Sequence, residues 1–146
     1  MRDQFSQVKH IAAVAAAALT ATPSRIVIDT KGFQSCVFNL STGVGGIAFT
    51  GANKIEWVLE DSDANDGGWA APEAKYVQLQ EGETYGAGGI VRAHTALHDA
   101  PSSRKVGYTG YKRFLSLRPV FSGTHGTATP VAATAILSHP LSAPVG

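Results

Sequence analysis

The stretch VGYTGYKRFLSLRPVFSGT (Val106–Thr124) decides the fold, because apolar and polar side chains alternate along its second half. Consecutive side chains of a β-strand point to opposite faces of a sheet, so residues two apart share a face. One face then holds Leu115, Leu117 and Phe121. The other face holds Phe114, Ser116, Arg118 and Val120. Pro119 has no backbone N–H to donate, so we expect it on an edge strand or at a bulge of a half-buried strand.

The same alternation recurs in FQSCVFNL, NKIEWVLED, AKYVQLQ and PVAATAILSHP, which begin at Phe33, Asn53, Ala74 and Pro130. Turn-forming clusters rich in Gly, Asp, Asn, Ser and Thr separate these segments. The residues expected to face the core are Cys36, Phe38, Leu40, Ile55, Trp57 and Leu59. Short strands between regular turns predict an all-β fold, an antiparallel β-sandwich of jelly-roll type with an N-terminal arm or strand.

The chain has 146 residues, which suits one hydrophobic core and leaves little room for a second domain. We expect an N-terminal arm or first strand over residues 1–24 and a single β-sandwich domain over residues 25–146. The formal net charge is +1 at pH 7, which predicts no strong long-range attraction to nucleic acid. Cys36 is the only cysteine, and its strand-like neighbours predict a buried, unreactive thiol.

The N-terminal segment MRDQFSQVKHIAAVAAAALTATPS has the charge, apolar run and small residues of a short secretory signal. Its apolar run, Ile11–Leu19, is too short to cross a bilayer. We expect a structural segment instead, a long strand or an arm rather than an alanine-rich helix, in a protein used without passing through a secretion route. A free apolar arm is a liability in solution, so we also expect Met1 to His10 to lie against a partner protein.

Two glycine-rich segments have the partial spacing of a ligand-binding loop. GVGGIA (Gly43–Ala48) fits a loose dinucleotide fingerprint, but turn and strand residues follow it rather than a helix, so we expect a hairpin loop. DSDANDGG (Asp61–Gly68) has the first oxygen ligands of a calcium loop, but Asp66 and Pro72 stand where glycine and glutamate are needed. We therefore expect a plain hairpin turn there.

His94 and His98 stand four residues apart in HTALHD. That spacing would bring two metal ligands together on a helix, whereas rings four residues apart on a strand are roughly 13 Å apart. We therefore expect solvated loop histidines. No metal ligand, cofactor-binding residue or catalytic residue is predicted anywhere in the chain, and we expect that the protein is not an enzyme.

A phosphate-binding strip, or the solvent-exposed face of a strand, could be formed by Lys112, Arg113 and Arg118. Strand alternation places Lys112 and Arg118 on the outward face and Arg113 on the inward one. We expect a solvated strand face, or a contact to the carboxylates of a partner subunit, rather than a phosphate site.

Four segments together resemble a family of small virion proteins of tailed bacteriophages. Members carry a D-T-K-G-F/Y turn, an L-x-E/H-S-D-D-G hairpin, a K-R-Y/F-(V/L)-R/S-L strand and a closing A-x-A-x-L-G-x-P-x-x-x-P. The matching residues here are Asp29–Phe33, Leu59–Asp63, Lys112–Leu117 and Ala133–Pro144. The sequence departs from the pattern where ANDGG lengthens the hairpin and where Ser138 replaces glycine.

The resemblance implies a structural virion protein that binds and stabilises the outer capsid surface, a decoration or cement protein. Its implied partners are the major capsid protein and further copies of itself in a homotrimer, with no nucleic acid and no membrane. It would be made in the host cytoplasm and located at the capsid surface of the virion.

Two other functions stay open. One is a neck, tail or head-fibre component, which copy number per virion would distinguish from a decoration protein. The other is a carbohydrate-binding adhesion module that uses aromatic side chains as stacking platforms. The candidate platforms are Trp57, Trp69, Tyr85 and Tyr108, of which we expect Trp57 in the core and Trp69 exposed.

Overall fold

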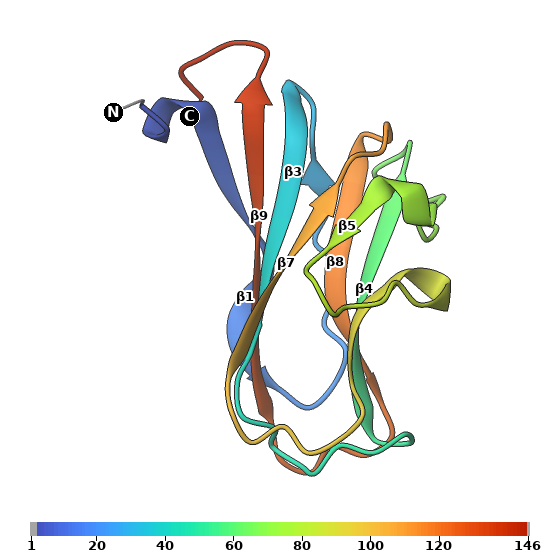
Figure 1. The fold of residues 1–146 in the computed structure, drawn as a ribbon. Helices are drawn as coiled ribbons and strands as arrows, with labels where there is room; N and C mark the ends of the chain where they lie inside the picture. The colour runs from blue at the N-terminus through green and yellow to red at the C-terminus, as the bar shows by residue number, and fades with distance from the viewer. Residues whose placement is uncertain (1–2, 146) are drawn as a thin grey trace.

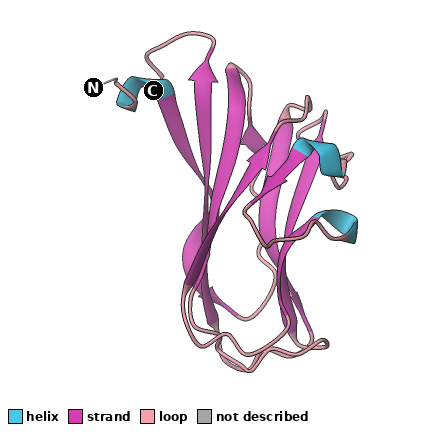
Figure 2. Ribbon diagram, viewed as in Figure 1, coloured by secondary structure: helices cyan, strands magenta, loops and turns pink. Residues whose placement is uncertain are grey.

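Two antiparallel β-sheets pack face to face in a computed structural model that describes residues 3–145 (Figure 1). The five-stranded sheet has the order β1 (Val8–Leu19), β9 (Thr129–Pro140), β3 (Phe33–Thr42), β7 (Ser102–Tyr108) and β5 (Val77–Leu79). The four-stranded sheet has the order β2 (Ile28–Asp29), β8 (Phe114–Ser122), β4 (Lys54–Ser62) and β6 (Ile90–His94). Within the described residues, the helical segments are single 3₁₀ turns (Figure 2): η1 (Phe5–Gln7), η2 (Ala74–Tyr76) and η3 (Ala87–Gly89).

The strand pairing is that of a jelly roll. Strands β1, β2, β3 and β4 pair with β9, β8, β7 and β6 respectively, so one half of the chain runs antiparallel to the other. Every connection between consecutive strands crosses from one sheet to the other. A long two-layer hairpin wrapped around one core gives this pattern, and β5 extends the larger sheet beyond β7. The predicted all-β sandwich of jelly-roll type is therefore confirmed.

The core consists of the side chains that the alternating pattern assigns to the inner faces. Trp57, Phe38 and Leu117 are fully buried, and Cys36 is buried beside them. The indole N–H of Trp57 donates to the hydroxyl of Thr42 at 3.0 Å, so the largest core side chain keeps no buried donor unpaired.

Pro119 lies opposite Trp57 of β4, in a strand that stands between β2 and β4. The register of β8 with β4 is continuous, so the predictions of an edge strand and of a bulge are both wrong. However, β2 covers only Phe114 and Leu115, and further along the N–H of Phe121 turns away from β4 to Thr22 Oγ1 at 2.9 Å. Pro119 is two residues before Phe121, so its nitrogen faces the same uncovered side and no ladder hydrogen bond is lost.

The N-terminal segment forms β1, as the strand alternative predicted. Ala13 and Val14 of β1 belong to the same buried cluster as the other strands. Among the described strands, β1 pairs with β9 alone, and its register shifts twice, between Ala12 and Val14 and between Val14 and Ala17. The division of the chain at residue 24 stays a prediction. Among the described residues, no helix is long and apolar enough to span a membrane.

The segment GVGGIA lies in the loop from β3 to β4, which are in different sheets. The prediction of a hairpin loop is therefore wrong, because a hairpin joins neighbouring strands of one sheet. Glycine is required at Gly46 because a Cβ there would lie 2.3 Å from the carbonyl oxygens of Thr127 and Ala128. The loop thus packs its backbone directly against the β8–β9 connection.

Candidate functional site

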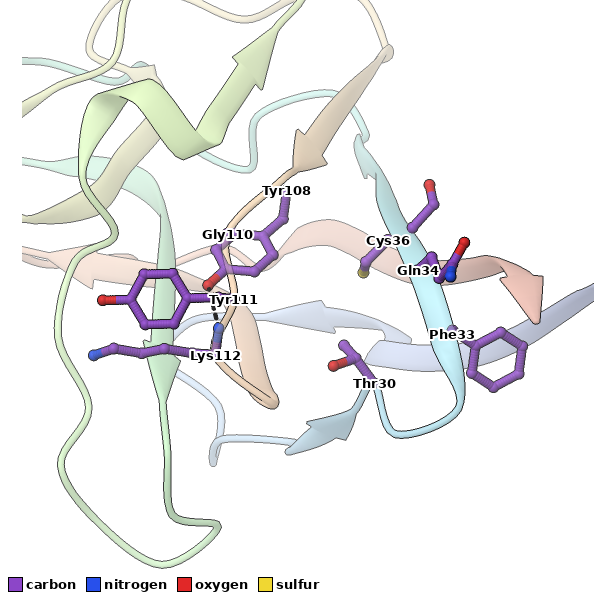
Figure 3. A pocket seen from close by; sticks show the side chains of 9 residues that line it. Thr30, Phe33, Gln34, Cys36, Tyr108, Gly110, Tyr111 and Lys112 are labelled. Carbon is purple, nitrogen blue, oxygen red and sulfur yellow. Dashed lines mark hydrogen bonds between the residues drawn. The ribbon is translucent and has the colours of Figure 1, made fainter. Parts of the chain in front are cut away.

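A cleft of about 240 Å³ opens between the start of β3 and the loop that joins β7 to β8. Figure 3 shows Tyr111 and Lys112 on one side of this cleft and Phe33, Gln34 and Cys36 on the other. The cleft lies where DTKGF (Asp29–Phe33) and GYKRF (Gly110–Phe114) come together in the fold.

A buried carboxylate organises the floor of this region. Asp61 is almost fully buried at the end of β4. One of its oxygens accepts a hydrogen bond from the Tyr108 hydroxyl at 2.9 Å, and the other lies 3.2 Å from Lys112 Nζ. The Tyr108 hydroxyl also accepts the backbone N–H of Lys112 at 3.2 Å. A buried charge needs such partners, so these three residues fix the loop on the end of the sheet.

The protonation states agree with a structural network. Burial and the hydrogen bond to Asp61 raise the pKa of Tyr108, which stays a neutral donor. The Asp61 carboxylate raises the pKa of Lys112, which stays a cation. A Cβ at Gly110 would lie 2.3 Å from the Tyr108 hydroxyl, so only glycine lets the loop wrap this closely. The network therefore holds the loop between β7 and β8 in place.

Tyr111 stands out on the surface beside this network, with 74% of its area exposed. Its ring meets Tyr76 edge-on, with the ring centroids 5.6 Å apart. A second cleft of about 110 Å³ adjoins Tyr111, lined by Asp61, Ala71, Pro72, Glu73, Tyr76, Tyr111 and Lys112. Tyr111 thus forms a ridge between two small clefts that carry polar side chains, and the sequence analysis did not single it out.

The Cys36 thiol is buried as predicted. Burial raises its pKa to about 12. The thiolate is the nucleophilic form, so at neutral pH this side chain has almost none of the reactive species.

The three cations of GYKRFLSLR are all paired within the chain. Lys112 pairs with Asp61, and Arg118 Nε lies 3.5 Å from Glu60. Arg113 forms a two-pronged contact with Asp29 at 2.8 and 2.6 Å, and it lowers the pKa of that carboxyl. These pairs agree with a structural role for the cations instead of a phosphate site.

The predicted faces of Lys112 and Arg113 are wrong, because β8 begins only at Phe114. Strand alternation therefore does not apply to these two residues. Arg113 was expected to point inward, and its side chain is instead about half exposed. The carboxylates that pair with the cations also belong to this chain, whereas one alternative placed them on a partner subunit.

The segment DSDANDGG closes back on itself, because the backbone groups of Asp61 and Ala70 exchange hydrogen bonds of 2.9 and 3.1 Å. Asp61, the first ligand of the calcium alternative, is in β4 and directs its oxygens to Tyr108 and Lys112. Within residues 3–145, no group of three or more His, Cys, Asp and Glu side chains is arranged to hold a metal ion.

The two histidines differ most from their prediction. His94 is buried at the end of β6, and the centroid of its ring lies only 4.5 Å from that of His98. The prediction of solvated loop histidines is therefore wrong for His94. The strand ends at His94, and the following loop turns back to bring His98 against it.

The predicted aromatic platforms are mostly covered. Trp57 and Tyr108 are buried. Trp69, which was expected to be exposed, is half-buried. The guanidinium of Arg25 lies 4.6 Å from the centroid of its ring and covers one face of it. Tyr85 is half-buried and donates its hydroxyl to the carbonyl of Pro72.

Comparisons with known proteins identify no family for this chain. No family model matches the chain, and no curated protein matches it. One solved structure aligns over 93% of this chain and 90% of its own, at 14% sequence identity and a TM-score of 0.40. It comes from Bacillus endospore appendages, described as a novel family of disulfide-linked pili. That similarity is too low to support a conclusion about this chain.

Proposed function

We propose that this chain is a structural virion protein that decorates and stabilises the outer surface of a tailed-bacteriophage capsid, most simply as a trimer. The proposal rests on the family resemblance, and one structural observation supports it. Within residues 3–145, β1 has a partner strand on only one side, and Ala15, Ala16, Ala17 and Ala18 are exposed along it. The Ala15–Ala18 part of this edge carries no charge, which favours contact with another protein.

The surroundings of β1 also suit a protein contact. Ala16 and Ala17 line a shallow apolar hollow of about 350 Å³ with Pro130, Val131 and Ala132 of the neighbouring strand. Small side chains let a partner backbone approach closely. The residues that line this hollow are uncharged, so removing water from it costs less free energy. The predicted contact from Met1 to His10 adjoins this edge, although Met1 and Arg2 lie outside the described residues.

A pair of matched substitutions tests the use of this edge. Ala16→Glu places a charge on β1, and Ala93→Glu places the same charge on an exposed alanine of β6, the edge strand of the other sheet. We expect Ala16→Glu to lower occupancy on intact particles at unchanged thermal stability, and Ala93→Glu to leave occupancy unchanged. Equal occupancy for both variants would contradict the assignment of β1 as the contact.

Copy number decides between the two virion locations. A density map of the intact particle should show hundreds of copies on the shell if the chain is a decoration protein. About a dozen copies or fewer would instead support a neck, tail or head-fibre component.

A second candidate is a glycan-binding module, and exposed Tyr111 favours it. A tyrosine ring held edge-on by Tyr76 offers a rigid apolar face, and the clefts on both sides supply polar partners such as Gln34 and Glu73. Affinity electrophoresis in gels that contain neutral hexose polysaccharides tests it. Retardation that is lost in Tyr111→Ala but kept in Leu97→Ala, an exposed side chain elsewhere, would support glycan binding.

A further inference from the structure

Three loops close the end of the sandwich that is drawn lowest in Figure 1, and hydrogen bonds tie them together. They span residues 43–53, 95–101 and 123–128. The N–H of Gly45 donates to the carbonyl of His98 at 2.8 Å, which joins the first loop to the second. The N–H of Thr124 donates to Asn53 Oδ1 at 2.9 Å, which joins the third loop to the first. The three loops therefore form one connected cover.

A chain of hydrogen bonds leads from the core to this cover. The indole N–H of Trp57 can only donate, so Thr42 Oγ1 accepts from it at 3.0 Å. The hydroxyl hydrogen of Thr42 is then free to donate to His94 Nε2, which lies 3.1 Å away. In this arrangement Nε2 is an acceptor, and the ring of His94 is neutral. All three side chains are buried.

The surroundings of His94 oppose a positive charge. The ring of His98, from the second loop, lies 4.5 Å away between centroids. Phe49 of the first loop packs at 6.0 Å, and His125 of the third loop packs on Phe49 at 6.1 Å. The other charges that act on His94 are Arg92, Arg104 and Glu83, and Glu83 accepts hydrogen bonds from both arginines. Glu83, whose charge would favour a protonated His94, is therefore already neutralised.

We propose that His94 and His98 form an acid-sensitive latch, which holds this end of the sandwich closed at neutral pH and releases it when His94 is protonated. A proton on Nε2 would leave the Thr42 hydroxyl hydrogen without its acceptor in a buried site. It would also place a positive charge at the edge of the hydrophobic core, directly against the ring of His98. Release of the three loops lets water reach the charged ring, so the open state binds the proton more tightly than the closed state. This latch is independent of the proposed capsid role.

The pH range over which the latch should open follows from the lowered pKa of His94. Burial first, and then His98 and Arg92, lower the pKa of His94 from 6.5 to about 4. The open state therefore carries more protons between these values, and its population rises as the pH falls through them. A pKa difference of this size raises the equilibrium constant for opening by about a hundredfold or more at low pH. No change is expected above neutral pH.

Backbone NMR of the full chain from pH 7.5 to pH 4.0 tests the latch. The amide of Gly45 and the indole N–H of Trp57 should change together, with a midpoint below 6.5. The amide of Leu141, bonded to Gly32 at the opposite end, should not follow that transition. A spectrum that stays constant over this range would overturn the proposal, as would simultaneous loss of the signals at both ends, which indicates global unfolding.

Three histidine variants assign the transition. His94→Gln can accept the Thr42 hydroxyl through its amide oxygen but does not titrate, so the Gly45 transition should disappear. His98→Gln removes the imidazole that helps to lower the pKa of His94 in the closed state, so the Gly45 transition should weaken and move to lower pH, and this variant serves if His94→Gln does not fold. His10→Gln alters an exposed histidine on β1 and should behave like the unmodified chain. An unchanged midpoint in His98→Gln, or an unchanged transition in His94→Gln, would refute the latch.

Discussion

Replacing Tyr108 with phenylalanine removes one oxygen from the buried network beside the Tyr111 ridge. The lost hydroxyl donates to Asp61 at 2.9 Å and accepts the N–H of Lys112 at 3.2 Å. Asp61 is 4% exposed, so little water can replace the missing donor. Hydrogen bonds to charged groups contribute about 1.5–3 kcal/mol. We expect Tyr108→Phe to lower the free energy of unfolding by about that amount, and Tm by about 3–12 °C in a chain of this length.

Tyr85→Phe is the matched control, because it deletes the same hydroxyl where the acceptor is neutral. Tyr85 is half-buried and donates to the carbonyl of Pro72 at 2.7 Å. Such bonds contribute about 0.5–1.5 kcal/mol. Urea unfolding followed by the fluorescence of buried Trp57 measures both variants. If Tyr108→Phe costs no more than Tyr85→Phe, the carboxylate does not depend on Tyr108 and the account of this network is wrong.

Three further outcomes test the core, the thiol and the turn. Leu117→Ala should lower the free energy of unfolding by about 2–5 kcal/mol in urea denaturation, because Leu117 is fully buried, whereas Val44→Ala on the surface should change it by less than about 0.5 kcal/mol. Cys36 should react with a thiol reagent only on unfolding, since burial raises its pKa to about 12; fast labelling of the native protein would contradict its placement. Millimolar calcium or a chelator should leave Tm unchanged, because Asp61 faces Tyr108 and Lys112, and a calcium-dependent rise would show that DSDANDGG binds the ion.

Period-two alternation predicted the inner faces of β3, β4 and β8 correctly. Trp57 and Leu117 are fully buried as expected, because the side-chain direction within one strand depends only on sequence spacing. Strand β2 gave no such signal. β2 has only Ile28 and Asp29, and its existence depends on pairing with Phe114 and Leu115 far along the chain.

The partners of the charged side chains could not be predicted for the same reason. Arg113 pairs with Asp29 across 84 positions of sequence, and Tyr108 donates to Asp61 across 47. The jelly roll brings these pairs together because β2 lies beside β8 and β7 lies over the end of β4. Their contact is a consequence of the whole topology, and no local motif encodes it.

His94 and His98 show where reasoning from spacing ceases to apply. A separation of roughly 13 Å follows only if the strand continues through both residues. β6 instead ends at His94, and the hydrogen bond from Gly45 to the His98 carbonyl holds the following loop back against the strand end, so the rings meet at 4.5 Å. Only glycine can approach this closely, because a Cβ at position 45 would lie 2.9 Å from the Phe49 ring. The glycine-rich segment first compared with a nucleotide loop is thus one of the elements that positions the histidine pair. Replacing Gly45 by alanine should therefore separate the rings and raise the midpoint of the His94 titration, a result that NMR of the ring protons would register directly.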